Sequence, residues 1–285
     1  MQQAHATTSD GIRLALRRHV PTVPRRGVAL LVHAMMANGS YLDRPTGAGF
    51  ASFLSHRGIE CFVLDLRGHG ASVPPSPRSS DWSFDAYVER DLPAAVAAVS
   101  EMARIHPGEI SCLGHSLGGL AGAAAIGTGT VPPPHRLVLV ATNTWHASGL
   151  DLWRRGLVGT IGIATSLLGY MPARAIRLGS DDEPAGYMGQ FRAWFRSGRW
   201  VSPSGIDYGA ALRTITTPAL VVSADADALC QPLDARLFAE RLGGTVSYRC
   251  VGRLRGDSVE VDHFGLLRHP ALARSLWGEI AAFLG

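Results

Sequence analysis

The sequence predicts an α/β domain built on a mostly parallel, twisted β-sheet, because short apolar runs alternate with helical segments along its 285 residues. The apolar runs are continuous, which is typical of strands covered on both faces. Seven strands are expected, at Ile12–His19, Val28–His33, Glu60–Asp65, Glu109–Gly114, Arg136–Ala141, Pro218–Ala224 and Val246–Val251.

Helical segments separate these runs and are expected to cover both faces of the sheet. They lie at Gly47–Arg57, Asp85–Ala103, Leu117–Ile126, Asp234–Leu242 and Pro270–Phe283. Residues 144–211 interrupt this alternation of strands and helices, because they contain short helical stretches and no clear strand. We therefore expect a core formed by residues 1–143 and 212–285, with residues 144–211 inserted as a cap. The cap would cover the carboxyl edge of the sheet, where open α/β sheets place their sites.

The composition excludes several classes of function. All 27 basic residues are arginine, so no lysine is present to form a Schiff base with a substrate or with pyridoxal phosphate. The arginines are spread along the chain without interleaved aromatic residues, which argues against nucleic-acid binding. No histidines, cysteines and carboxylates stand at metal-ligand spacing, and Gly68 and Gly70 lack the context of a dinucleotide loop. We expect neither a metal nor another cofactor.

The chain carries no apolar segment typical of targeting or membrane anchoring. Its first residues lack the apolar stretch of a signal peptide, and glycines and a proline interrupt the longest apolar run, Leu157–Ala173. The four cysteines form no C-x-x-C pair. These features predict a cytoplasmic protein with reduced thiols and no stable membrane insertion.

One short motif carries the predicted chemistry. Gly114-His115-Ser116-Leu117-Gly118 fits the pattern G-x-S-x-G, between an apolar strand and a helix of small residues. This order of strand, sharp turn and helix is that of a nucleophile elbow, which exposes the serine hydroxyl above the sheet. Because the turn brings neighbouring chain close, the positions two before and two after the serine must lack bulk. The alternative is a plain glycine turn with an incidental serine; the context favours Ser116 as a nucleophile.

Three motifs resemble the α/β-hydrolase superfamily, and the resemblance covers nearly the whole chain. They are GHSLGG, the strand segment LLVHAMMANGS, and DLRGHGAS after the next strand. The segments DDEPAGYMGQFRAWFRSGRW and DHFGLLR also resemble a bacterial branch of predicted hydrolases. The resemblance implies an α/β-hydrolase fold and a Ser-His-Asp triad in the chain order serine, acid, histidine.

The chain order selects the base and narrows the choice of acid. Beyond the last predicted strand lie only His263 and His269, and His269 precedes Pro270 at the start of a helix, so His263 is predicted as the base. Asp225 and Asp227 both follow the strand at Pro218–Ala224. The run SADAD resembles family loops that place the acid at Asp227, with Asp225 as the alternative.

Two backbone N–H groups are expected to bind the oxyanion of a tetrahedral intermediate. The first belongs to Leu117, the residue after the nucleophile. The second comes from the loop after the strand Val28–His33, where the resemblance points to Met35. The family usually has His-Gly here, whereas this chain has His33-Ala34. Without that glycine, the loop must reach its shape in another way.

These residues predict acyl transfer on a small-molecule substrate. Ser116 would attack an ester carbonyl, His263 would take its proton, and water would then cleave the acyl-enzyme. Apolar residues of the cap favour a small or lipid-like apolar acyl group, although they could equally form the cap's own core. Seven arginines of the cap leave an anionic substrate open. A thioesterase, acyltransferase or cyclase with the same triad is the alternative function.

Overall fold

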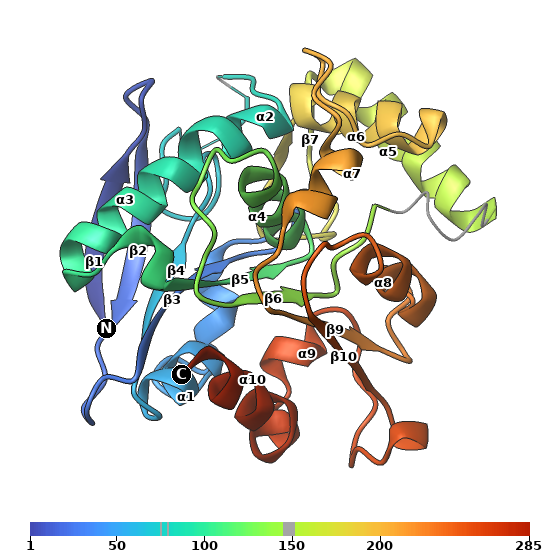
Figure 1. Cartoon of the computed structure of the whole chain (residues 1–285). Helices are drawn as coiled ribbons and strands as arrows, with labels where there is room; N and C mark the ends of the chain where they lie inside the picture. Colours follow the sequence, from blue (N-terminus) through green and yellow to red (C-terminus); the bar gives the residue numbers. More distant parts are fainter. Residues whose placement is uncertain (75, 79, 145–151) are drawn as a thin grey trace.

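The computed structural model describes residues 1–74, 76–78, 80–144 and 152–285. Eight strands form one sheet in the order β1-β2-β4-β3-β5-β6-β9-β10 (Figure 1). The strands from β4 to β10 run parallel, whereas β2 pairs antiparallel with β1 and with β4. The prediction of a mostly parallel sheet is therefore confirmed. The carboxyl ends of the parallel strands meet at one edge, above which the candidate site lies.

All seven predicted strands are present. They are β2 (Arg13–His19), β3 (Gly27–Val32), β4 (Ile59–Leu64), β5 (Ile110–His115), β6 (Leu137–Val140), β9 (Ala219–Ala224) and β10 (Val246–Val251). The sequence missed β1 (Gln2–Thr7), which pairs with β2 at the edge of the sheet. Its run QQAHAT is largely exposed, with one fully buried residue, so it lacks the apolar signal of the covered strands.

Helices cover both faces of the sheet, as predicted. The helices α1 (Phe50–Ser55) and α10 (Leu276–Leu284) lie on one face, with α3 (Leu92–Ala103) and α4 (Leu117–Gly127) on the other (Figure 1). A short helix, α2 (Phe84–Ala86), and one π-helical turn lead into α3. The helices α8 (Pro232–Ala239) and α9 (Gly265–Arg268) complete the core.

The prediction of one continuous helix over Pro270–Phe283 is wrong. A 3₁₀ turn covers Pro270–Arg274, and α10 starts only after Ser275, whose φ of −111° and ψ of −100° are not helical. The apolar pattern is continuous across this break, because the side chains on both sides still face the core: Leu272, Leu276 and Ile280 are all buried. Periodicity alone therefore did not show that the backbone is interrupted.

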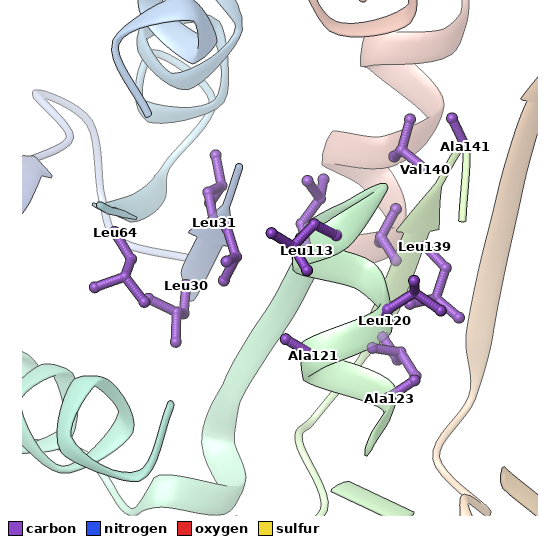
Figure 2. Packing of buried hydrophobic residues seen from close by; sticks show 14 of the residues in the cluster. Leu30, Leu31, Leu64, Leu113, Leu120, Ala121, Ala123, Leu139, Val140 and Ala141 are labelled. Atoms are coloured by element: carbon purple, nitrogen blue, oxygen red, sulfur yellow. The ribbon is translucent and has the colours of Figure 1, made fainter. Parts of the chain in front are cut away.

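The hydrophobic core lies between the sheet and its helices. Figure 2 shows leucines of β3, β4, β5 and β6 packed beside α4, among them Leu30, Leu64 and Leu113. Each such fully buried side chain contributes about 1.5–3 kcal/mol relative to its exposed state. The helix α4 presents mainly alanine and glycine to its surroundings and is almost wholly buried. Its small side chains allow close packing against the sheet. Because α4 follows β5 after one residue, its N-terminus lies at the carboxyl edge of the sheet.

The insert between β6 and β9 is mostly helical. Within its described part, residues 152–211, it contains α5 (Leu152–Leu168), α6 (Ala185–Ser197) and the short α7 (Tyr208–Ala211). Two short strands, β7 (Tyr170–Met171) and β8 (Glu183–Pro184), pair with each other and were not predicted. Residues 145–151 of the predicted cap lie outside the described residues. Among the helices that the structure describes, none has the length and apolar character needed to cross a membrane.

Candidate active site

Ser116 stands at a sharp turn between β5 and α4. Its φ of +52° lies in the left-handed region, which costs a residue with a Cβ conformational energy. Its N–H donates to the carbonyl of Val140 at 2.9 Å, which ties the turn to β6. A Cβ added at Gly114 or Gly118 would lie under 3.0 Å from backbone atoms. The two glycines therefore permit the close chain approach that the motif required, and Ser116 lies at the N-terminus of α4.

His263 and Asp227 form a buried pair, although they come from different loops. Asp227 follows the end of β9 by three residues, and His263 lies between β10 and α9. The Nδ1 atom of His263 lies 2.8 Å from Oδ2 of Asp227. The second oxygen of Asp227 accepts the N–H groups of Leu229 at 2.8 Å and Cys230 at 2.9 Å. These bonds fix the carboxylate, which in turn holds the proton of His263 on Nδ1 and leaves Nε2 able to accept one.

Asp225, the alternative acid, makes different contacts. Its carboxylate accepts hydrogen bonds from the Cys250 thiol at 3.2 Å and from Arg255 at 3.3 Å. The bond from Cys250, followed by that from Arg255, lowers the pKa of Asp225. Among the described residues, no hydrogen bond or ion pair joins it to His263. The structure thus brings Asp227, and not Asp225, together with the predicted base.

Ser116 and His263 line the same cavity, which has a volume of about 120 Å³. Within the described part of the chain, no hydrogen bond joins their side chains. Such bonds are often long in a free enzyme and tighten in the substrate complex. Both predicted oxyanion residues, Met35 and Leu117, also line the cavity. The structure therefore places four of the five predicted site residues around one space, with Asp227 behind His263.

The walls of the cavity are mainly apolar and come partly from the insert. The insert contributes Leu157 and Ile161 from α5, Leu178, and Tyr187 and Phe191 from α6. Among the described residues that line the cavity there is no arginine.

The two tryptophans of the insert whose side chains the structure describes do not line the cavity. Trp194 and Trp200 are buried and pack against Phe84 at ring-centroid distances of 5.0 Å and 6.1 Å. Tyr208 joins the same cluster, 5.5 Å from Phe84. Among the described residues of the insert, one set of aromatic side chains therefore packs against Phe84 of α2, and another set of apolar side chains lines the cavity.

The backbone amides of the loop after β3 differ in whether they are hydrogen bonded. The N–H of Ala34 donates to the Tyr41 hydroxyl at 3.1 Å, and the N–H of Met36 donates to Glu183 at 2.5 Å. The N–H of Met35, between them, has no acceptor among the described residues. The N–H of Leu117 belongs to the first position of α4, where no intrahelical acceptor exists. This pattern is the one expected for two oxyanion donors.

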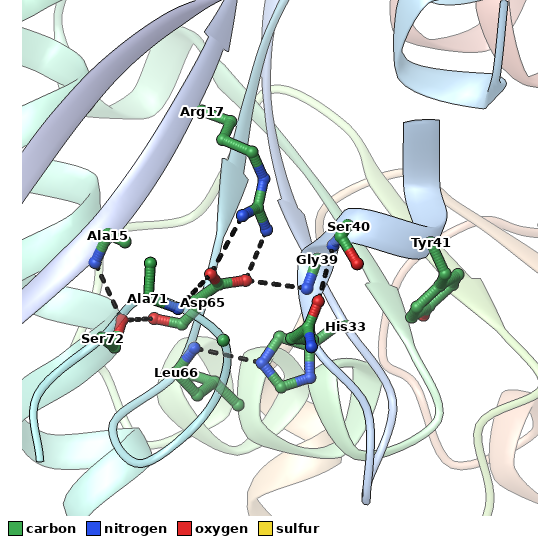
Figure 3. Close-up of polar contacts among 12 residues, drawn as sticks. Ala15, Arg17, His33, Gly39, Ser40, Tyr41, Asp65, Leu66, Ala71 and Ser72 are labelled. Carbon is green, nitrogen blue, oxygen red and sulfur yellow. Dashed lines mark hydrogen bonds and ion pairs between the residues drawn. The ribbon is translucent and has the colours of Figure 1, made fainter. Parts of the chain in front are cut away.

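Asp65, at the end of β4, holds the far end of this loop. Figure 3 shows its carboxylate between Arg17 and two backbone N–H groups. The N–H of Gly39 donates to it at 2.8 Å and that of Ala71 at 3.0 Å. One buried carboxylate thus joins the loop after β3 to the turn after β4, and that turn belongs to the motif DLRGHGAS.

Two buried histidines beneath the loop carry different charges. His33 accepts the N–H of Leu66 at Nε2 and faces the carbonyl of Ala34 through Nδ1, which fits a neutral ring. Burial lowers the pKa of His33 to about 4. His69 faces an acceptor on each side, the Arg67 carbonyl at 2.9 Å and Glu183 at 3.1 Å. Both of its nitrogens must therefore donate, which fits an imidazolium ion.

The charge of His69 predicts a dependence of stability on pH. Burial disfavours the imidazolium, but the carboxylate of Glu183 outweighs it and raises the pKa of His69 to about 9. Unfolded histidine titrates near 6.5, so this stabilisation is complete below about pH 6.5 and is lost as the pH rises through about 9. We expect the free energy of unfolding to fall by roughly 3 kcal/mol over that interval. Denaturant titrations from pH 6.5 to 9.5 measure it. A His69→Gln variant, which cannot titrate, should give a flatter curve; parallel curves would contradict this assignment.

Sequence reasoning missed three residues that support the site. The Tyr41 hydroxyl lies 2.6 Å from Nδ1 of His115, whose ring centroid is 4.8 Å from that of His263. Burial lowers the pKa of His115, so this ring packs on the predicted base without a competing charge. Glu183 is fully buried and reaches the loop after β3 from the insert. The only sequence signal for Glu183 was its place in the segment DDEPAGYM.

The sheet order and the strained serine between β5 and α4 define the α/β-hydrolase class. The model of the alpha/beta hydrolase family matches residues 29–274, and the chain belongs to this family. The predicted superfamily and fold are therefore confirmed. No curated protein matches the sequence.

Solved structures with the same fold include three hydrolytic enzymes. An esterase from Exiguobacterium antarcticum is 13% identical with a TM-score of 0.65, over 99% of both chains. A hydrolase from Pseudomonas aeruginosa is 20% identical with a TM-score of 0.60, over 100% of this chain and 98% of that one. An enol-lactonase from Burkholderia xenovorans is 17% identical with a TM-score of 0.61, over 99% of both chains. At these identities the likeness shows the fold alone.

Proposed function

We propose that the protein is a serine esterase whose triad is Ser116, His263 and Asp227, acting under a cap formed by residues 144–211. The observation that carries this proposal is the buried pair of His263 and Asp227 beside the cavity that Ser116 lines. A serine hydroxyl is a weak nucleophile at neutral pH unless a positioned base takes its proton. The elbow, the base and the oriented acid together supply that activation.

The proposed reaction has two halves. The Oγ of Ser116 attacks the ester carbonyl while Nε2 of His263 takes its proton, and the N–H groups of Met35 and Leu117 bind the resulting oxyanion. The intermediate collapses, His263 protonates the leaving alcohol, and an acyl-enzyme remains. Water then attacks the acyl-enzyme with His263 again as base, which releases the acid and restores Ser116. Asp227 keeps the proton of His263 on Nδ1 throughout.

The cavity favours a small, uncharged acyl group over a long lipid chain. Its volume of about 120 Å³ is close to that of an engineered apolar cavity of about 150 Å³ that binds benzene. Among the residues that the structure describes, its walls carry no carboxylate and no guanidinium group. An acyl group of roughly four to six carbons, or a small ring, matches this space.

A panel of chromogenic esters and matching thioesters tests the proposal. We expect hydrolysis of esters with burst kinetics, and a protein mass raised by one acyl group when the reaction is stopped early. Thioester cleavage without ester cleavage, or transfer to an added alcohol in preference to water, would favour the thioesterase or acyltransferase alternative. Absence of both turnover and labelling by a fluorophosphonate would contradict the triad.

The position of Ile161 gives a prediction about acyl-chain length. Ile161 lines the cavity from α5 and is 7% exposed, whereas Ile163 on the same helix is 62% exposed and does not line the cavity. Ile161→Ala should enlarge the cavity and make acyl chains about two carbons longer the best substrates. The longer chains gain because each additional buried methylene contributes about 0.8 kcal/mol. Measurement of kcat/KM along the ester series checks this, with Ile163→Ala as the control. An equal shift in both variants, or in neither, would contradict the assigned acyl site.

A further inference from the structure

The insert carries three consecutive carboxylates, two of which contact the core at or beside the oxyanion loop. This name is used for the loop after β3 that contains Met35. Glu183 is fully buried, and its Oε1 accepts the N–H of Met36 at 2.5 Å and lies 3.1 Å from Nε2 of His69. Asp181 accepts the N–H of Gly70 at 2.8 Å and the side-chain amide of Asn38 at 2.6 Å. Asp182 instead accepts the N–H of Arg174, within the insert. Two of the three therefore hold parts of the core.

The bond to Glu183 falls where the loop is strained. Met36 has a φ of +56°, although it is not a glycine, and it lies next to the proposed oxyanion donor Met35. A residue with a Cβ keeps such a backbone conformation only when its surroundings enforce it. Here the carboxylate accepts a hydrogen bond from the Met36 N–H, and the Tyr41 hydroxyl accepts one from the Ala34 N–H. The unbonded N–H of Met35 lies between these two fixed points.

The second partner of Glu183 is His69. His69 must donate through both nitrogens, because the Arg67 carbonyl and the Glu183 carboxylate are both acceptors. His69 and the Met36 N–H donate to the same Oε1 atom of Glu183, and a carboxylate oxygen forms a stronger hydrogen bond with an N–H group than a neutral oxygen does. Asp181, His33 and Tyr87 are the other titratable groups around His69.

We propose that Glu183 is a positioning residue that fixes the oxyanion loop from the insert, by holding the Met36 N–H so that the Met35 N–H faces the cavity. This inference rests on the proposed function, because the oxyanion belongs to the proposed reaction. In this chain, the carboxylate supplies the backbone restraint for a loop that has Ala34 after His33. Docking of the insert and competence of the oxyanion site are thereby linked at Met36, whose carbonyl also accepts the N–H groups of Ser180 at 2.9 Å and Asp181 at 3.3 Å from the insert.

Variants of Glu183 separate this role from general stability. Glu183→Ala removes the acceptor, and Glu183→Gln keeps a neutral oxygen in the same place. We expect kcat for the best ester to fall roughly 10- to 100-fold in Glu183→Ala, with KM changed less than about threefold, because a misplaced oxyanion donor acts on the transition state. Affinity for an alkyl boronic acid, which forms a tetrahedral anion on Ser116, should fall by a similar factor. Glu183→Gln should recover most of kcat, and the matched control Asp182→Asn should match the wild type.

Hydrogen exchange of the Met36 amide tests the same idea without any activity. The exchange should be slow in the wild type, roughly tenfold faster in Glu183→Gln and fastest in Glu183→Ala, following the strength of the acceptor. If Glu183→Ala does not fold, the Glu183→Gln comparison still decides the question. Unchanged exchange in the Glu183 variants would overturn the inference, as would a rise in KM at constant kcat. A wild-type protein inactive on every ester would instead count against the proposed function, while exchange still reports on Glu183.

Discussion

Ser116→Ala is expected to lower ester turnover by roughly a million-fold, the largest effect of any single substitution in this chain. The substitution removes the only atom that forms the covalent bond to the acyl group in the proposed reaction, so the remaining groups can act only through binding and oxyanion stabilisation. Those groups should still accelerate hydrolysis about a thousandfold over the uncatalysed reaction in water. Steady-state kinetics with a short-chain ester measures the loss.

The buried serine on β5 provides the matched control for this experiment. Ser111 is 1% exposed and lies five residues before Ser116, but it does not line the cavity. Ser111→Ala should keep turnover within about threefold of the wild type, because surface and structural changes away from the site rarely alter the reaction. A fluorophosphonate should label Ser111→Ala and leave Ser116→Ala unlabelled. Turnover within tenfold of the wild type in Ser116→Ala would remove Ser116 from the mechanism.

The fold was predictable where one physical signal dominated. The five central strands are continuous apolar runs because helices cover both of their faces, and this pattern is rare outside a buried parallel sheet. The edge strand β1 has no such cover, so its polar residues gave no signal. The break at Ser275 was hidden for the opposite reason: the apolar side chains on both sides reach the same core, although the backbone between them is not helical.

The candidate site was predictable only in part. Ser116 has a local signature, since the glycines that the sharp turn needs stand beside it in the sequence. The choice of His263 and Asp227 depended on the chain order of the resembling family, and the structure brings these two together. Glu183 could not be found in this way, because its contact with Met36 joins residues 147 positions apart and depends on how the insert docks. The missing glycine after His33 indicated an altered loop without showing what holds it.

Asp227→Asn is expected to lower kcat by roughly ten-thousand-fold while leaving the fold intact. The Oδ1 of Asp227 accepts two backbone N–H groups, from Leu229 and Cys230, so an asparagine at this position would keep its oxygen there. Its amide group would then face Nδ1 of His263 as a donor. The imidazole would have to carry its proton on Nε2, where it cannot accept the proton of Ser116. The loss therefore arises from the wrong tautomer and not from a missing side chain.

Asp225→Asn is the control that separates the two candidate acids, because both residues lie in the same loop and the same atoms change. Its contacts are with Cys250 and Arg255, and its side chain is 25% exposed, so we expect turnover within about threefold of the wild type. Thermal unfolding of both variants verifies that each is folded. Equal losses in the two variants would show that the acid does not act through the tautomer of His263. A larger loss in Asp225→Asn would instead require the loop to rearrange before catalysis, since in this structure only Asp227 reaches the imidazole.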